Sequence, residues 1–142
     1  MKALLDTNVI VDALQSCEPW AGDAQAIFRA AANQRFIGCV TAKAIADIHY
    51  LTRRCTHSEA LARETLGKLF MLFELLDITA MDCRQALASR TVDYEDAIMI
   101  ETAQRERIDC IVTRNLEDYR HPPIQIRSPA AFLEALNADT GI

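Results

Sequence analysis

Short apolar runs alternate with longer segments of helical period along this chain. The apolar runs predict strands at residues 2–5, 36–40, 73–78, 109–113 and 124–127. The segments between them predict helices at residues 9–14, 23–33, 42–54, 58–72, 79–89 and 93–106, and a last helix follows residue 128. Strands that alternate with helices favour a parallel sheet with helices on both faces. The predicted fold class is therefore α/β, a three-layer α/β/α arrangement around a parallel sheet of about five strands.

Capping residues support several of these helix starts. Thr41 and Ser58 each precede a segment of helical period, and Thr79 with Asp82 three residues later resembles a capping box. Pro129 follows Ser128 in the first turn of the last helix, where proline is tolerated. These residues mark the points at which the chain passes into a helix.

The overall composition is that of one globular domain. The 142 residues are 51% hydrophobic and 25% charged, which predicts a single domain over residues 1–142. The net charge of -5 argues against a protein that coats nucleic acid by charge alone, but it allows a basic rim around an acidic site. The start of the chain lacks a signal-peptide pattern, and no apolar run is long enough for a membrane span. We expect a soluble, cytoplasmic protein without a membrane partner.

The cysteine pattern predicts thiols rather than disulfides or a zinc site. The five cysteines are scattered along the chain, and none forms a Cys-x-x-Cys pair. Cys39 and Cys110 lie inside apolar segments. We expect reduced and mostly buried thiols.

Acidic and amide residues follow the predicted strands. Asp6 comes directly after the first strand, Asp47 lies in the helix after the second, and Asp96 opens the helix near residue 93. Asn115 and Asp118 follow the fourth strand. The carboxyl ends of parallel strands meet at one edge of a sheet, where ligands bind. We therefore expect these residues to converge there.

Each acid also has a purely structural interpretation. Asp6 alone is a good helix cap, Asp47 borders an apolar stripe, and Asp96 stands where an acid favours the helix dipole. Asp118 is a plausible turn residue. Several carboxylates at one edge repel each other, however, and a divalent cation relieves that repulsion. Oxygen ligands without well-spaced Cys or His favour Mg²⁺ or Mn²⁺.

Four segments in order resemble the motifs of PIN-domain nucleases. They are LLDTNVIVDAL, TAKAIADIHYLTRR, DYEDAIMIETA and CIVTRNLEDYR, and together they span essentially the whole chain. The nearest variety is the small bacterial PIN protein, which includes the ribonuclease toxins of VapBC-type pairs. The resemblance implies a PIN-like parallel sheet and an acidic pocket with one or two Mg²⁺ or Mn²⁺ ions. It also implies hydrolysis of RNA phosphodiester bonds by a metal-activated water.

The resemblance also assigns roles to individual acids. Asp6 and Asp96 are the first and third acids, and Asp47 fills the second place, where many relatives have Glu. Asn115 stands where many relatives have Asp, so Asp118 is expected to supply the missing charge. The implied catalytic acids are Asp6, Asp47, Asp96 and Asp118, and Asn115 joins them as an implied metal ligand. The departure at Asn115 leaves open whether one or two ions bind.

Substrate contacts are expected beside the acids. The resemblance implies that Thr7 and Asn8 position a metal-bound water or a phosphate. Arg114 and Arg54 are candidate phosphate contacts, because such arginines raise affinity for nucleic acid. Asp12, more than one helical turn beyond Asn8, is expected at the surface.

Other functions fit less well. A phosphatase of the haloacid-dehalogenase type needs a second Asp where Asn8 stands, and a phospho-receiver domain needs paired acids and a late Lys that are absent. A PIN-like binding module that has lost catalysis remains open because of Asn115. A toxin role implies an antitoxin protein that buries the acidic pocket. The apolar helices at residues 23–33 and 61–72 are a candidate homodimer face.

Overall fold

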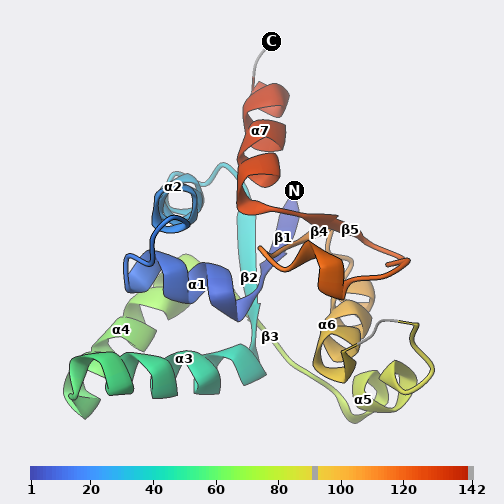
Figure 1. Ribbon diagram of the computed structural model, residues 1–142, viewed down its shortest axis with the longest axis horizontal. Coiled ribbons are helices and arrows are strands. Elements are labelled where there is room, and N and C mark those ends of the chain that lie inside the picture. Colours follow the sequence, from blue (N-terminus) through green and yellow to red (C-terminus); the bar gives the residue numbers. More distant parts are fainter. Residues whose placement is uncertain (91–92, 141–142) are drawn as a thin grey trace.

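Five parallel strands form the centre of the protein in the computed structural model, which describes residues 1–90 and 93–140 (Figure 1). They are β1 (Lys2–Leu5), β2 (Ile37–Thr41), β3 (Glu74–Leu76), β4 (Cys110–Val112) and β5 (Gln125–Arg127). Their order across the sheet is β3-β2-β1-β4-β5, and every neighbouring pair is parallel. This arrangement confirms the predicted parallel α/β sheet.

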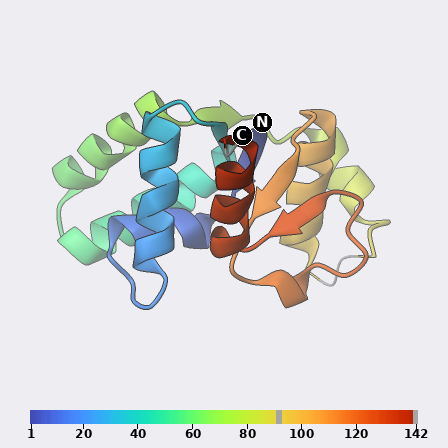
Figure 2. The same ribbon diagram turned by 90° about the horizontal axis from the view of Figure 1, so that it is seen from above.

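Helices cover both faces of the sheet (Figure 2). They are α1 (Thr7–Leu14), α2 (Ala21–Ala32), α3 (Ala42–Thr56), α4 (Glu59–Leu72), α5 (Ala80–Ala86), α6 (Tyr94–Arg105) and α7 (Pro129–Thr140). Side chains alternate along β1: Ala3 and Leu5 pack into the core formed with α1, α2, α3, α4 and α7, whereas Leu4 packs into the core formed with α6. The two cores make the predicted three-layer arrangement.

The predicted caps are confirmed, whereas some element ends differ from the prediction. The side chains of Thr41 and Ser58 accept hydrogen bonds from the first turns of α3 and α4, and Thr79 and Asp82 form a capping box. Helix α2 begins two residues earlier than predicted, and α5 ends three residues earlier. A short 3-10 helix, η1 (Leu116–Asp118), was not predicted. Such short turns carry no periodic signal in the sequence.

The cysteines are free, as predicted, but they are not mostly buried. Cys39 and Cys110 lie in the core, whereas Cys55 is exposed and Cys17 and Cys83 are intermediate. No helix within residues 1–90 and 93–140 is both long and apolar enough to cross a membrane.

The strand order places a crevice at the ends of β1 and β4. The chain passes from β1 to β2 and β3 on one side, and then to β4 and β5 on the other side of β1. The strand order therefore reverses between β1 and β4, which is where α/β sheets bind ligands. Asp6 directly follows β1 and Thr113 directly follows β4, so both lie at this point.

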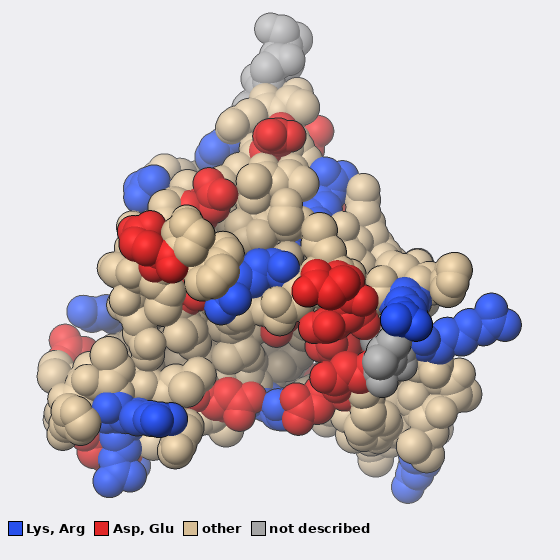
Figure 3. Space-filling view, viewed as in Figure 1, with Lys and Arg blue, Asp and Glu red and all other residues tan. Residues whose placement is uncertain are grey.

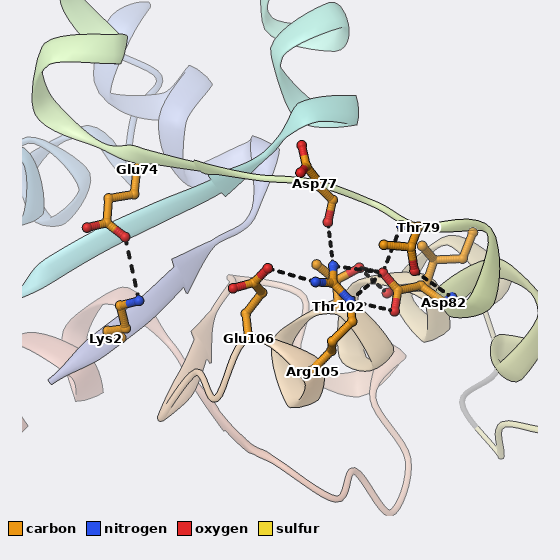
Figure 4. Close-up of polar contacts among 9 residues, drawn as sticks. Lys2, Glu74, Asp77, Thr79, Asp82, Thr102, Arg105 and Glu106 are labelled. Atoms are coloured by element: carbon orange, nitrogen blue, oxygen red, sulfur yellow. Dashed lines mark hydrogen bonds and ion pairs between the residues drawn. The ribbon is translucent and has the colours of Figure 1, made fainter.

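A buried ion pair fastens α5 to α6 (Figure 4). Asp82 is only 1% exposed, and its carboxylate accepts hydrogen bonds from Arg105 Nη2 at 3.0 Å and from Thr102 Oγ1 at 3.2 Å. Burial alone would raise the pKa of Asp82, but the hydrogen bonds from Arg105 and Thr79 outweigh it and lower that pKa. Arg105 Nη2 also donates to the carbonyl oxygen of Asp77 at 2.6 Å. The network therefore holds the β3–α5 connection against α6.

Loss of this ion pair is expected to destabilise the protein strongly. Arg105→Ala leaves the Asp82 carboxylate buried without its counter-charge, so the free energy of unfolding should fall by about 3 kcal/mol. Chemical denaturation measures this loss. Arg63→Ala is the matched control, because it removes an exposed ion pair with Glu59 and should leave stability almost unchanged. Equal stabilities of the two variants would contradict the role assigned to Arg105.

Candidate active site

Asp6 lies at the centre of the polar residues that follow the strands. Its Oδ1 accepts the backbone N–H of Thr7 at 2.8 Å, which caps α1. Its Oδ2 accepts hydrogen bonds from Thr113 Oγ1 at 2.8 Å and from Asn8 Nδ2 at 3.2 Å. Burial raises the pKa of Asp6, although the hydrogen bonds from Thr113 and Thr7 work against the rise. Asp6 is therefore both a helix cap and a partly buried acid in a crevice.

Asp96 is the second perturbed acid. It lies in the first turn of α6, and Tyr119 Oη donates a hydrogen bond to its Oδ1 at 3.3 Å. Burial, followed by the negative charges of Asp6 and Asp93, raises the pKa of Asp96 to about 6. Asp118 adds to the rise for both Asp6 and Asp96. The sequence predicted that these acids converge, and the structure brings Asp6, Asp96 and Asp118 to one crevice.

The crevice has two lobes that meet at Asp6, Thr7 and Asp96. One lobe, of about 630 Å³, extends to Lys43 and Asp47 on α3 and to the β3–α5 connection. The other lobe, of about 370 Å³, extends to Asn8, Asp93, Arg114, Asn115 and Asp118. In the space-filling view, acidic side chains gather around a hollow in this face (Figure 3). We call the two lobes together the acidic cleft.

Most predicted site residues line the acidic cleft, but Arg54 does not. Those in the cleft are Asp6, Thr7, Asn8, Asp47, Asp96, Arg114, Asn115 and Asp118. Arg54 lies near the far end of α3, in a separate groove with Tyr50, Arg53 and His57. The cleft thus brings together residues from α1, α3 and α6 and from the segment that follows β4.

Lys43 neutralises part of the larger lobe. Its Nζ lies 2.9 Å from Asp47 Oδ2 and 3.3 Å from Glu95 Oε2. The hydrogen bond to Asp47 is the main cause of a raised pKa for Lys43. Asp47 therefore already has a counter-charge, whereas the charges of Asp6 and Asp96 meet mainly other acids.

Three contributors to the cleft were not predicted as site residues. Thr113 is fully buried and donates a hydrogen bond to Asp6, and Tyr119 donates one to Asp96. Lys43 forms an ion pair with Asp47. A polar residue at the end of a predicted apolar strand was the one available signal for Thr113. Tyr119 and Lys43 carry no comparable signal, because their roles depend on tertiary contacts.

The prediction that Asp12 lies at the surface is wrong. Asp12 is 2% exposed, and its Oδ2 accepts a hydrogen bond from Arg114 Nε at 2.8 Å. Arg114 comes from the segment after β4, 102 residues further along the chain. This cation covers Asp12 and neutralises it, which makes the burial of the carboxylate possible.

The donor atoms suit a hard cation in an open site. They are carboxylate and amide oxygens, and the buried Oδ1 of Asn8 has no hydrogen-bond partner among the described residues. In the described part of the chain, no group of three or more His, Cys, Asp or Glu side chains is spaced to hold a metal ion. Mg²⁺ commonly binds through one or two carboxylates and keeps several waters, so the residues fit a partly hydrated ion.

Residues 2–117 match a protein-family model described as PIN domain. The chain belongs to the PIN-domain family. No curated protein matches this PIN domain in sequence.

Solved structures share the fold of this PIN domain. One is a chain of VapBC2 from Rickettsia felis bound to a DNA fragment from their promoter, at 17% identity and a TM-score of 0.64 over 90% of this chain and 98% of that one. A chain of a toxin–antitoxin complex from Klebsiella pneumoniae has 24% identity and a TM-score of 0.67 over 89% and 97% of the two chains. Mycobacterium tuberculosis VapC20, described as a sarcin–ricin loop cleaving toxin, has 16% identity and a TM-score of 0.59 over 77% and 86%.

The raised pKa of Asp96 predicts a pH effect on the stability of the metal-free PIN domain. Between about pH 4 and pH 6 the folded protein keeps a proton that the unfolded carboxyl has lost, so the free energy of unfolding falls as pH rises. Asp96→Asn removes this contribution and should raise the melting temperature at neutral pH. Thermal melts in chelator across this range test the effect. Asp23→Asn, exposed on α2, is the control, and a lower melting temperature for Asp96→Asn at neutral pH would contradict the prediction.

Proposed function

We propose that this PIN domain is a metal-dependent endoribonuclease, which hydrolyses RNA phosphodiester bonds with a water activated by Mg²⁺ or Mn²⁺. The observation that carries the proposal is the pair Asp6 and Asp96, which line one cleft. Burial raises the pKa of both acids, and the negative charge of Asp6 adds to the rise for Asp96. Acids with raised pKa values in a cleft are typical of functional sites, where a positively charged ligand stabilises the carboxylates. A divalent cation supplies that charge, and RNA supplies the phosphate that the cation neutralises.

The proposed roles follow from the position of each side chain. Asp6 and Asp96 would hold the metal ion, and Asp47, Asn115 and Asp118 would contact it directly or through water. When bound, the ion lowers the pKa of a water molecule and neutralises charge on the phosphate. The oxygen donors support the proposal of Mg²⁺ or Mn²⁺, because such donors suit hard divalent cations.

The chain's own residues orient this centre. Thr113 and Thr7 donate hydrogen bonds to the two carboxylate oxygens of Asp6 and so fix its rotamer. Tyr119 donates a hydrogen bond to Asp96 and fixes that side chain. Burial raises the pKa of Tyr119, so its hydroxyl stays protonated as a donor. We assign Asn8 the role of binding a water molecule, because its buried Oδ1 has no hydrogen-bond partner within residues 1–90 and 93–140.

We further propose that the protein is the toxin of a toxin–antitoxin pair in the cytoplasm. The support is the fold shared with chains of the Rickettsia felis and Klebsiella pneumoniae complexes. An antitoxin would then cover the acidic cleft. A homodimer is proposed through α4, which exposes Leu61, Phe70 and Met71 at 50%, 48% and 90%.

A binding module without catalysis is the alternative. It is favoured by Asn115, which lacks the charge that many relatives carry there. It is also favoured because the described residues include no group of three or more His, Cys, Asp or Glu side chains that could hold a metal ion. RNA cleavage by wild type and by the Asp6→Asn and Asp96→Asn variants separates the two functions.

Neutralising either acid of the proposed centre should abolish cleavage. Asp6→Asn and Asp96→Asn each remove a metal ligand, so the rate of RNA cleavage in Mg²⁺ or Mn²⁺ should fall about 100-fold or more. Gel analysis of an RNA substrate, with chelator as the blank, measures the rate, and Asp23→Asn should cleave like wild type. Equal cleavage by wild type and both cleft variants would contradict the proposed site. Absence of cleavage in all proteins, together with tight binding of a partner, would favour the binding module.

The groove at the far end of α3 should contribute to RNA affinity. Arg54 lines this groove with Tyr50, Arg53 and His57. We therefore expect a bound RNA strand to run from the acidic cleft along α3. Arg54→Gln should weaken binding several-fold, by about 1 kcal/mol, and reduce the salt dependence by about one charge. Titration of labelled RNA at several salt concentrations measures both effects. Arg29→Gln, which removes an exposed charge from α2, should change neither, and identical losses in the two variants would contradict a local contact.

A further inference from the structure

A stack of three side chains borders the smaller lobe of the acidic cleft. Arg114 Nε donates to Asp12 Oδ2 at 2.8 Å, and Arg114 Nη2 lies 3.4 Å from Asp12 Oδ1. The guanidinium carbon of Arg114 lies 4.0 Å from the centre of the Trp20 ring, which is a cation–π distance. Asp12 comes from α1, Trp20 from the start of α2, and Arg114 from the segment after β4.

The stack fixes one edge of the guanidinium and leaves the other available. A guanidinium has five N–H donors in a rigid plane, and Asp12 engages only Nε and Nη2. Among the described residues no acceptor pairs with Nη1, and the side chain of Arg114 is 31% exposed. Asp12 and Trp20 therefore hold the plane of Arg114 without using all of its donors.

The position of Arg114 makes it suited to an anion. It lines the lobe that also contains Asp6, Asp96 and Asp118, and it is the one Lys or Arg among the described residues of that lobe. A phosphate group that approaches the acids needs a positive charge beside them, and a planar guanidinium matches two phosphate oxygens.

We propose that Asp12 and Trp20 are positioning residues that hold Arg114 ready to bind a phosphate of RNA beside the acidic centre. The proposal rests on the proposed ribonuclease function and adds a phosphate subsite with its supports. A simpler role for Arg114 is neutralisation of the buried Asp12 alone. The two roles differ in what happens when both charges are removed together.

A double variant separates binding from stability. Arg114→Gln leaves the Asp12 carboxylate buried without a cation, so the melting temperature should fall, and RNA affinity should fall about tenfold. Asp12→Asn/Arg114→Gln leaves no buried charge, so the melting temperature should recover towards that of wild type. If Arg114 binds phosphate, the affinity of the double variant stays about tenfold low. Recovery of affinity together with stability would overturn the proposal.

Binding is measured with a labelled single-stranded oligoribonucleotide in chelator. Since this readout needs no cleavage, a protein that binds RNA through Arg114 but does not cleave it would contradict only the ribonuclease function. Normal cleavage by wild type with unchanged affinity in Arg114→Gln would contradict only the phosphate subsite. Arg29→Gln controls for the loss of one positive charge.

Trp20 provides a direct signal from the stack. It is the only tryptophan in the chain, so its fluorescence reports on the neighbourhood of Arg114. RNA should change this emission in wild type and leave it unchanged in Arg114→Gln. Trp20→Leu removes an exposed ring and should fold normally, yet it should weaken RNA binding about threefold through loss of the cation–π contact. Unchanged emission in wild type at saturating RNA, or full affinity in Trp20→Leu, would overturn the role of Trp20.

Discussion

The fold of the cleft depends on the partly buried carboxylate of Asp6, whose charge must be satisfied at the junction of two strands. Thr113 at the end of β4 and Thr7 at the start of α1 both donate hydrogen bonds to it. The same carboxylate therefore begins α1, ties β1 to β4 and sets where the crevice opens. Helix α6 brings Asp96 close to Asp6, and burial together with the negative charge of Asp6 raises the pKa of Asp96.

A contrast between paired and unpaired acids distinguishes this cleft from the rest of the protein. Asp82 pairs with Arg105, Asp12 pairs with Arg114, and Asp47 pairs with Lys43. Asp6 and Asp96, by comparison, have only neutral hydrogen-bond donors from Thr, Asn and Tyr. The two buried acids Asp12 and Asp82 each have an arginine partner, whereas Asp6 and Asp96 do not. The cleft therefore keeps a local excess of negative charge, which favours a cation at this place.

Sequence reasoning predicted what depends on local pattern and on the rules of parallel sheets. Alternating strands and helices predicted the layers, and the position of Asp6 and Asp96 after strands or at a helix start predicted that they converge. The hydrogen bond from Arg114 to Asp12 joins residues 102 positions apart, and the local sequence pattern of α1 does not predict it. Tyr119 and Lys43 escaped prediction for the same reason, and the ends of α2 and α5 shifted because packing rather than periodicity sets them.

On the proposed function, the two cations found among the described residues of the cleft help an acidic protein to accept a polyanion at an acidic site. Lys43 stands in the larger lobe and Arg114 in the smaller one, so positive charge lies on both sides of Asp6 and Asp96. Each cation is paired with a carboxylate, which fixes its position but removes part of its attraction for phosphate. On the proposed function, the metal ion adds to this attraction, so RNA binding near the acids and metal binding are coupled by charge.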